Sequence, residues 1–443
     1  MNCFVRRLWS PRRADFPVTA ALLVAVLIFC GAVSAVLAGE EHEDSDFSHT
    51  TFLTAIGIPG SAIRSFDISW VDSDRGLYFL GDRSNSGVDI ISTKTNTFLG
   101  RAGGFVGIQP ATALSDPHHV AANNNISGPD GVVSRGNCLY AGDGNSTLRV
   151  YNISDPTHPT LVGTPIKTGG STRLDEMALT SDGKMLIAVN NAEDPPFATL
   201  FSTDPDDCDS TNIVNKIEAD LLTIPPGAGL SIEQPTWVES IHRFIVSVPT
   251  IANNTFDPSP CNYGTVNPTA PPCSGAVLVV DPTNLLTPIE KVVSLNQCGP
   301  NGATVGPHGN VMVGCTPNNQ KTDKETTIIN VKTFNYVDVG NLTGSDEVWY
   351  NRGSNRYYTG SSAKPGGAVL GVVDGTTNFL LETIPQSSAS HSVAADSERN
   401  EIYVPQVGPK SMVGIGGDVT TVGQSICGGM SGCVAVYKGG RDE

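Results

Sequence analysis

Seven polar residues recur along the chain at matching points of one repeating pattern, each at the start of a short apolar stretch. They are Asp67, Asp130, Asp175 or Glu176, Glu233, Asn301, Asp346 or Glu347, and His391. Carboxylates dominate this set, and carboxylates that converge on one point can bind a hard cation such as calcium or magnesium. Carboxyl groups in different surroundings can also act as a general acid and a general base. The alternative is structural, because polar residues at the entry to a strand often bond neighbouring backbone amides.

These positions lead to two hypotheses about a site. A divalent cation (calcium, magnesium or zinc) would be bound by Asp67, Asp130, Asn301 and Asp346. Proton transfer, if the protein is an enzyme, would use His391, Glu176 and Glu233. No organic cofactor is indicated, and whether the protein is catalytic stays open at this point.

Other histidines are weaker candidates for chemistry. His118 and His119 follow Asp116 in a stretch rich in Pro and Asn. Neighbouring residues of a strand point to opposite faces, so only one of this pair could reach a shared channel. We expect them to form an exposed loop pair rather than a metal site. His308 stands between Pro307 and Gly309 and is expected to be a turn residue.

Trp70, Trp237 and Trp349 recur near the first strands of three copies of the pattern. They could pack one copy against the next, or they could form an aromatic wall for a sugar or another flat ligand.

The repeating pattern predicts the elements that carry these residues. Each copy has a short apolar strand, a turn with Asp, Gly or Asn, a second strand rich in Tyr, Val and Ile, and a third alternating strand. Copies that begin at Asn301, Asp346 and His391 are 45 residues apart. Seven copies with period-two alternation and almost no helical periodicity predict an all-β fold, a seven-bladed β-propeller, with six blades as the alternative.

The ends of the pattern predict how the ring closes. Residues 432–438 read as the third strand of the last copy, and no fourth strand follows them. Residues 51–58 form a strand-like stretch without a partner ahead of the first copy. Pairing the two would complete the last blade and remove an exposed edge.

Parts of the repeat resemble known propeller families. Residues 148–163 resemble the repeat of exported propellers called LVIVD or YVTN-like, and residues 391–404 are similar to its second half. The turns at residues 128–131 and 299–302 resemble the P-D-G and P-N-G turns of the gluconolactonase and senescence-marker-protein family. That resemblance implies a divalent metal at the channel mouth, bound by Asp130 and Asn301, that polarises a lactone carbonyl and activates water. The two turns occur here in reversed order, and the first copy offers Asp67 where that family has a Glu.

Residues 1–38 read as an export signal, and residues 39–50 as an acidic linker before a single domain at 51–440. Four arginines precede a long uncharged stretch, and small residues at Val36 and Ala38 predict cleavage after Ala38. The alternative is a retained membrane anchor, because about 20 apolar residues can span a bilayer. Export predicts a secreted, periplasmic or extracellular protein.

The eight cysteines beyond the signal favour disulfides in an exported chain. Cys261–Cys273 and Cys427–Cys433 would each close a loop rich in Gly or Pro, which leaves Cys298–Cys315 and Cys138–Cys208. Connectivity cannot be read from the sequence itself.

The charge balance excludes one class of partner. Asp and Glu number 44 against 27 Lys and Arg, so the formal net charge of -17 would repel a phosphate backbone, and no nucleic acid is expected. We therefore expect a monomeric, secreted propeller that binds a small molecule or a protein partner at one face of the disc, with membrane contact only if the signal is retained. The alternative is a metal-dependent lactonase or hydrolase with its site at the mouth of the central channel.

Overall fold

The computed structural model describes residues 48–110, 123–220, 223–226, 230–252, 274–296, 298–316, 325–413 and 416–440. The predicted signal and its cleavage point, nearly all of the linker, the His118–His119 pair and the insertion with Cys261 and Cys273 lie outside these residues. The described chain belongs to a compact unit that spans His49–Arg441.

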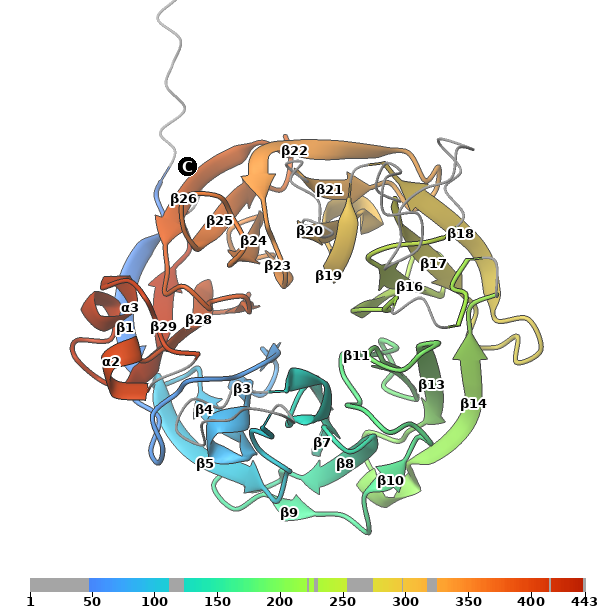
Figure 1. Cartoon of the computed structure of the whole chain (residues 1–443), viewed down its shortest axis with the longest axis horizontal. Helices are drawn as coiled ribbons and strands as arrows, with labels where there is room; N and C mark the ends of the chain where they lie inside the picture. Colours follow the sequence, from blue (N-terminus) through green and yellow to red (C-terminus); the bar gives the residue numbers. More distant parts are fainter. Residues whose placement is uncertain are drawn as a thin grey trace, which may run out of the picture. The chain divides into compact units, whose positions relative to one another are not determined.

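Seven antiparallel sheets stand in a ring, and we number these blades in chain order (Figure 1). Blade 1 consists of β2 (Ser69–Asp72), β3 (Leu77–Asp82), β4 (Gly87–Ser92) and β5 (Thr97–Gly103). Blade 2 consists of β6 (Val132–Arg135), β7 (Cys138–Asp143) and β8 (Thr147–Asn152), with β9 (Thr160–Leu161) and β10 (Ile166–Lys167) both paired to β8. Blade 3 consists of β11 (Met177–Leu179), β12 (Met185–Asn190), β13 (Phe197–Ser202) and β14 (Asn212–Glu218).

Blades 4 to 6 repeat the same plan. Blade 4 consists of β15 (Pro235–Val238), β16 (Arg243–Val248), β17 (Gly275–Val280) and β18 (Ile289–Leu295). Blade 5 consists of β19 (Gly299–Val305), β20 (Val311–Thr316), β21 (Glu325–Ile329) and β22 (Tyr336–Thr343). Blade 6 consists of β23 (Val348–Asn351), β24 (Arg356–Ser361), β25 (Val369–Asp374) and β26 (Leu380–Pro385). The all-β, seven-bladed prediction is confirmed, and the six-bladed alternative is wrong.

Blade 7 joins the two ends of the described chain. It consists of β27 (Ala394–Asp396), β28 (Glu401–Val407), β29 (Gly432–Lys438) and β1 (Thr51–Ile56). In Figure 1, β1 lies beside β29, and their register aligns Thr51 with Lys438 and Ile56 with Val434. The predicted closure is confirmed, and it leaves β29 without an open edge. Between β28 and β29 the chain also forms two short helices that the sequence did not suggest, α2 (Lys410–Val413) and α3 (Val422–Ile426).

Turn residues explain why the first and second strands pair in every blade. Just before each second strand, one residue adopts a left-handed backbone conformation with a φ between 51° and 77°. These residues are Gly76, Gly136, Gly183, His242, Gly309, Asn355 and Asn400. Gly and Asn tolerate that conformation best, so the Gly and Asn of the repeat mark its hairpins.

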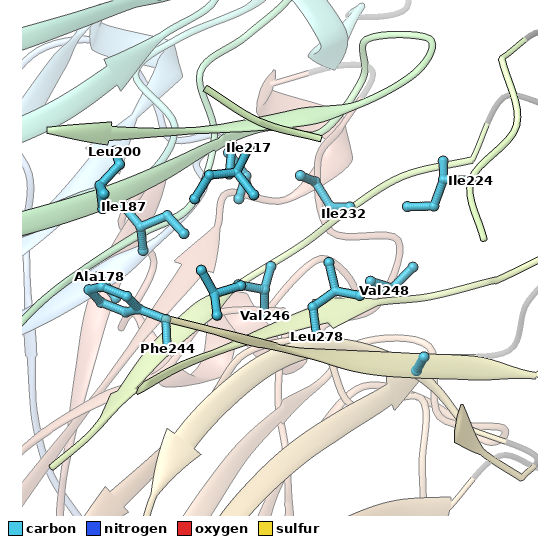
Figure 2. Packing of buried hydrophobic residues seen from close by; sticks show 14 of the residues in the cluster. Ala178, Ile187, Leu200, Ile217, Ile224, Ile232, Phe244, Val246, Val248 and Leu278 are labelled. Carbon is cyan, nitrogen blue, oxygen red and sulfur yellow. The ribbon is translucent and has the colours of Figure 1, made fainter. Parts of the chain in front are cut away.

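The core lies between neighbouring blades rather than inside each sheet. In Figure 2, Ile187, Leu200 and Ile217 of blade 3 face Phe244 and Val246 of blade 4. Similar buried clusters join the other neighbouring blades. Alternating apolar residues thus serve both faces of each sheet, which explains the period-two pattern.

Three disulfides close segments of the ring. Cys138 on β7 pairs with Cys208 of the 3-10 turn η3 (Cys208–Ser210), so this bond ties blade 2 to blade 3. Cys298 pairs with Cys315, and Cys427 pairs with Cys433. All three pairings are as predicted, and three disulfides are typical of an oxidising, extracellular environment. No helix in the described part of the chain is long and apolar enough to cross a membrane.

Candidate functional site in the central channel

The repeated polar residues lie where each inner strand begins, at one end of the channel. Asp67, Asp130, Asp175, Glu233 and Asp346 each stand two residues before their strand. Each backbone N–H donates to a carbonyl of the second strand of the same blade, at distances from 2.7 to 3.0 Å. The pairing holds the backbone of these residues at the channel. In blade 5, Asn301 lies in a register shift of β19 between Pro300 and Ala303.

A cavity of about 540 Å³ occupies this end of the channel. Its wall includes most of the predicted residues, namely Asp67, Glu176, Glu233, Asn301, Asp346 and His391. A volume in this range suits a small-molecule ligand. Asp130 is fully buried and does not line the cavity, because Arg83 lies against it.

Both members of the two acidic pairs Asp175-Glu176 and Asp346-Glu347 face the cavity. The sequence offered the two members of each pair as alternatives, whereas in the structure all four residues line the cavity, just ahead of β11 and β23.

Two arginines that the sequence analysis missed neutralise the aspartates. Arg83 comes from the 3-10 turn η1 (Arg83–Asn85), and its Nη2 lies 2.6 Å from an oxygen of Asp67. Its Nε donates to Asp130 Oδ1 at 3.0 Å. The Nη2 of Arg173 lies 2.7 Å from Asp175, and its Nη1 lies 3.5 Å from Asp67. One signal was available, because Arg173 stands two residues before Asp175.

Because of these two arginines, the three aspartates Asp67, Asp130 and Asp175 are a poor site for a metal ion. Carboxylate oxygens of Asp67, Asp130 and Asp175 lie within 4.8 Å of one another, a spacing that suits a metal ion. The two guanidinium groups already bind these three carboxylates through charged hydrogen bonds. A cation at the three aspartates would have to compete with Arg83 and Arg173 for the same oxygens.

His391 is held between an acid and an aromatic ring. Its Nδ1 donates to the carbonyl of Ala389 at 2.8 Å, and its Nε2 lies 3.5 Å from Asp67 Oδ1. The ring stacks on Phe66 with centroids 4.7 Å apart. Burial alone would lower the pKa of His391, but the hydrogen bond with Asp67 and the charges of Asp346 and Asp67 raise it overall. With an acceptor near each nitrogen, the geometry suits a protonated imidazolium better than a general base.

Asp67 is the ionised centre of this group. Burial alone would raise the pKa of Asp67. The charge of Arg83, the hydrogen bond with His391 and the charge of Arg173 outweigh burial and hold that pKa below its usual value.

Glu176 and Glu347 differ from the aspartates, because no arginine among the described residues forms an ion pair with either of them. They come from blades 3 and 6, which stand on opposite sides of a seven-membered ring. Their carboxyl groups are close enough to share a hydrogen bond. Both side chains are buried, and Glu176 Oε2 and Glu347 Oε1 have no donor among the described residues other than the two glutamates themselves.

Protons are therefore held tightly on this pair. Burial and then the nearby charge of Asp346 raise the pKa of Glu347 to about 8. Burial and then Glu347 itself raise the pKa of Glu176 well above its usual value.

Glu233 and Asp346 flank the pair in the cavity wall. Burial raises the pKa of Glu233 to about 7, against the charge of Arg173 and a hydrogen bond from Asn191 at 3.2 Å. Burial also raises the pKa of Asp346, although His391 and Asn301 oppose it. Asn301 Nδ2 donates to Asp346 Oδ1 at 3.1 Å, so two of the predicted metal ligands meet here.

The glycines of the P-D-G and P-N-G turns have a packing role. A Cβ on Gly131 would lie 2.1 Å from the carbonyl oxygen of Asp175, and one on Gly302 would lie 2.4 Å from that of Asp346. Each glycine therefore lets the inner strand of the next blade approach closely. This packing accounts for the glycines of both turns without a metal. His308 is an exposed turn residue with a φ of 60°, as expected.

Comparisons with known proteins define the fold and nothing finer. No family model matches the chain, and no curated protein matches it. A chain in a crystal structure of the mitotic checkpoint complex is similar, with a TM-score of 0.52 and 11% identity over 91% of this chain and 95% of that chain. A chain of hydrazine synthase from Kuenenia stuttgartiensis has a TM-score of 0.54 and 11% identity over 78% of this chain and 94% of that chain. At this identity the likeness is one of architecture, which unrelated functions share.

Proposed function

We propose that the protein is a secreted binding propeller that takes a small cationic ligand into the cavity at the acidic end of its channel. The observation that carries the proposal is the pair of buried oxygens, Glu176 Oε2 and Glu347 Oε1, which receive no hydrogen bond from any group of the described residues other than the two glutamates themselves. A buried carboxyl oxygen without a donor is costly, so the pair favours a proton, an ammonium group or a metal ion beside it. A cavity of about 540 Å³ at the channel end is of a size that favours a small ligand over a protein partner.

The rest of the wall supports a ligand that carries positive charge. Asp67, Asp130 and Asp175 have their arginines, whereas no cation among the described residues bonds to Glu176 Oε2 or Glu347 Oε1. A cation that binds between these glutamates would displace protons that they hold. Binding should therefore release protons at neutral pH and tighten as the pH rises toward the pKa of Glu347, about 8.

The test is titration calorimetry at pH 8 and pH 6 with calcium, magnesium, manganese, zinc, ammonium and putrescine as probes. We expect at least one probe to bind more tightly at pH 8, with proton release that changes with the buffer. The double variant Glu176→Gln, Glu347→Gln should lose that binding. The matched control is Glu218→Gln, which changes an exposed carboxylate on β14 and should bind as the wild type does. Lack of binding by every probe, or binding that survives in the double variant, would refute the proposal.

A metal-dependent lactonase or hydrolase is the second candidate, and the contact between Asn301 and Asp346 favours it. Both residues line the cavity and carry oxygen ligands, and Glu233 lies in the same wall. A calcium, magnesium or zinc ion there would supply Lewis-acid polarisation of a carbonyl. The test is turnover of a panel of lactones and esters by metal-loaded protein, with Asp346→Asn as the variant. If the wild type shows no turnover, or Asp346→Asn keeps full turnover, this candidate is rejected.

A further inference from the structure

The other end of the channel carries a second cavity of about 470 Å³ with different chemistry. The inner strands lead from the acidic residues toward it. Trp70 follows Asp67 by three residues, and Trp349 follows Asp346 by three. At about 3.3 Å per strand residue, this places the two ends roughly 10 Å apart along the channel.

Aromatic side chains from three blades form the wall of this second cavity. Trp70 on β2, Trp237 on β15 and Trp349 on β23 line it together with Tyr350. Trp70 and Trp349 meet edge to face with centroids 5.1 Å apart, and Trp237 meets Phe244 in the same way at 4.9 Å. Each of the three indoles is only half-buried, so packing between blades covers part of each ring and leaves the rest to the cavity.

Polar groups stand among these rings. The indole Nε1 of Trp70 is shielded from solvent and has no acceptor within the part of the chain that the structure describes. Trp237 differs, because its Nε1 donates to Glu239 at 2.7 Å. Side chains with hydroxyl and amide groups, including Ser181, Gln234 and Thr236, complete the wall.

We propose that this aromatic cavity binds a neutral sugar ring. A pyranose has apolar C–H faces that pack on indole rings, and it has hydroxyl groups that both donate and accept hydrogen bonds. Such hydroxyl groups would face Ser181, Gln234 and Thr236 of the same wall. The charged residues of this wall nearly balance, because Arg352 stands against Asp74 and Glu398, so a neutral ligand fits better than one of high charge.

Tryptophan fluorescence tests the proposal directly. The chain has four tryptophans, three of which line this cavity, and Trp9 lies outside the described residues. In a Trp9→Phe background, the emission of the full chain therefore comes from this site alone. The probes are glucose, galactose, mannose, xylose and N-acetylglucosamine, their β-linked disaccharides, and benzoate as a flat aromatic compound without indole emission.

We expect at least one sugar to shift the emission in a saturable way, and Trp237→Ala to weaken that sugar at least tenfold. Trp237→Phe keeps a ring and should retain part of the affinity, which separates a stacking role from loss of folding. Phe379→Ala removes an exposed ring on the outer rim and is the matched control. No response to any sugar, a response only to benzoate, or full sugar affinity in Trp237→Ala would overturn the proposal. The double variant Glu176→Gln, Glu347→Gln should leave sugar binding intact, because neither residue lines this cavity. The sugar proposal can therefore be tested independently of the cation site.

Discussion

The carboxyl pair at the channel axis should make stability fall as the pH rises through neutrality. Folding raises the pKa of Glu347 from 4.5 to about 8, so between these values the folded protein holds a proton that the unfolded chain releases. The stability from this proton is complete below pH 4.5 and is lost as the pH approaches about 8. The shift corresponds to about 5 kcal/mol of unfolding free energy across that window.

Glu347→Gln removes this titration while keeping the shape of the side chain. The unfolding free energy of the variant should therefore fall less than that of the wild type between pH 5 and pH 8, by as much as about 4 kcal/mol. Glu347 is also the first of the charges that raise the pKa of Glu176. In the variant the neutral amide side chain at this position would raise the pKa of Glu176 less, which should weaken the pH dependence further.

The assay is equilibrium unfolding in guanidinium chloride at pH 5, 6, 7 and 8, with intact disulfides and a constant m-value as the check for two-state behaviour. Glu218→Gln is the control and should give a profile parallel to the wild type, because that carboxylate is exposed. Parallel profiles for Glu347→Gln and the wild type would refute the reasoning that Glu347 holds a proton in the folded protein.

Three further predictions concern stability and use the same unfolding assay. Gly142→Ala should lower the free energy of unfolding by about 2 kcal/mol or more, because the added Cβ would lie 1.9 Å from a backbone carbonyl of the next blade. A Cβ on Gly103 would meet nothing within 4 Å, so Gly103→Ala should stay within about 0.5 kcal/mol of the wild type. Equal effects would contradict the close approach of the blades. Arg83→Met should lower the free energy of unfolding by about 3–5 kcal/mol, because it removes the guanidinium group nearest to two buried carboxylates, Asp67 and Asp130, and a neutral result would mean that they fold protonated. Replacing Cys138–Cys208 by alanines should lower the free energy of unfolding by about 4 kcal/mol, and replacing Cys427–Cys433 should lower it by about 2 kcal/mol. The first bond spans 70 residues and the second spans 6, so the first restricts the entropy of the unfolded chain more. The reverse order would argue against chain entropy as the cause.

The repeat could be read from the sequence because each of its signals is local. The third strand of the last copy was predicted at residues 432–438, and β29 has those bounds. The left-handed residues that set the hairpins are Gly, Asn or His placed directly before such strands, so the turns also left a visible mark.

The candidate site was only partly readable, because its electrostatics depend on contacts between blades. Arg83 binds an aspartate of its own blade and one of the next, and nothing near it in the chain marks that role. Glu176 and Glu347 lie in blades 3 and 6, and no local pattern shows that they meet. The resemblance of the P-D-G turn to a metal-binding turn pointed to Asp130, whereas in the folded chain that residue lies against Arg83, outside the cavity wall.

The sequence by itself determined the unit of this protein: a four-stranded blade, repeated, with polar residues at one end of each inner strand and aromatic residues at the other end of three of them. Alternation, turn residues and the unpaired terminal strands are properties of short segments, and they suffice for a closed ring. The tertiary structure alone decided which carboxylates receive an arginine, which share a proton and which face a cavity. The reason is physical: the free energy of a buried charge depends on the groups around it, and in a propeller those groups come from other blades.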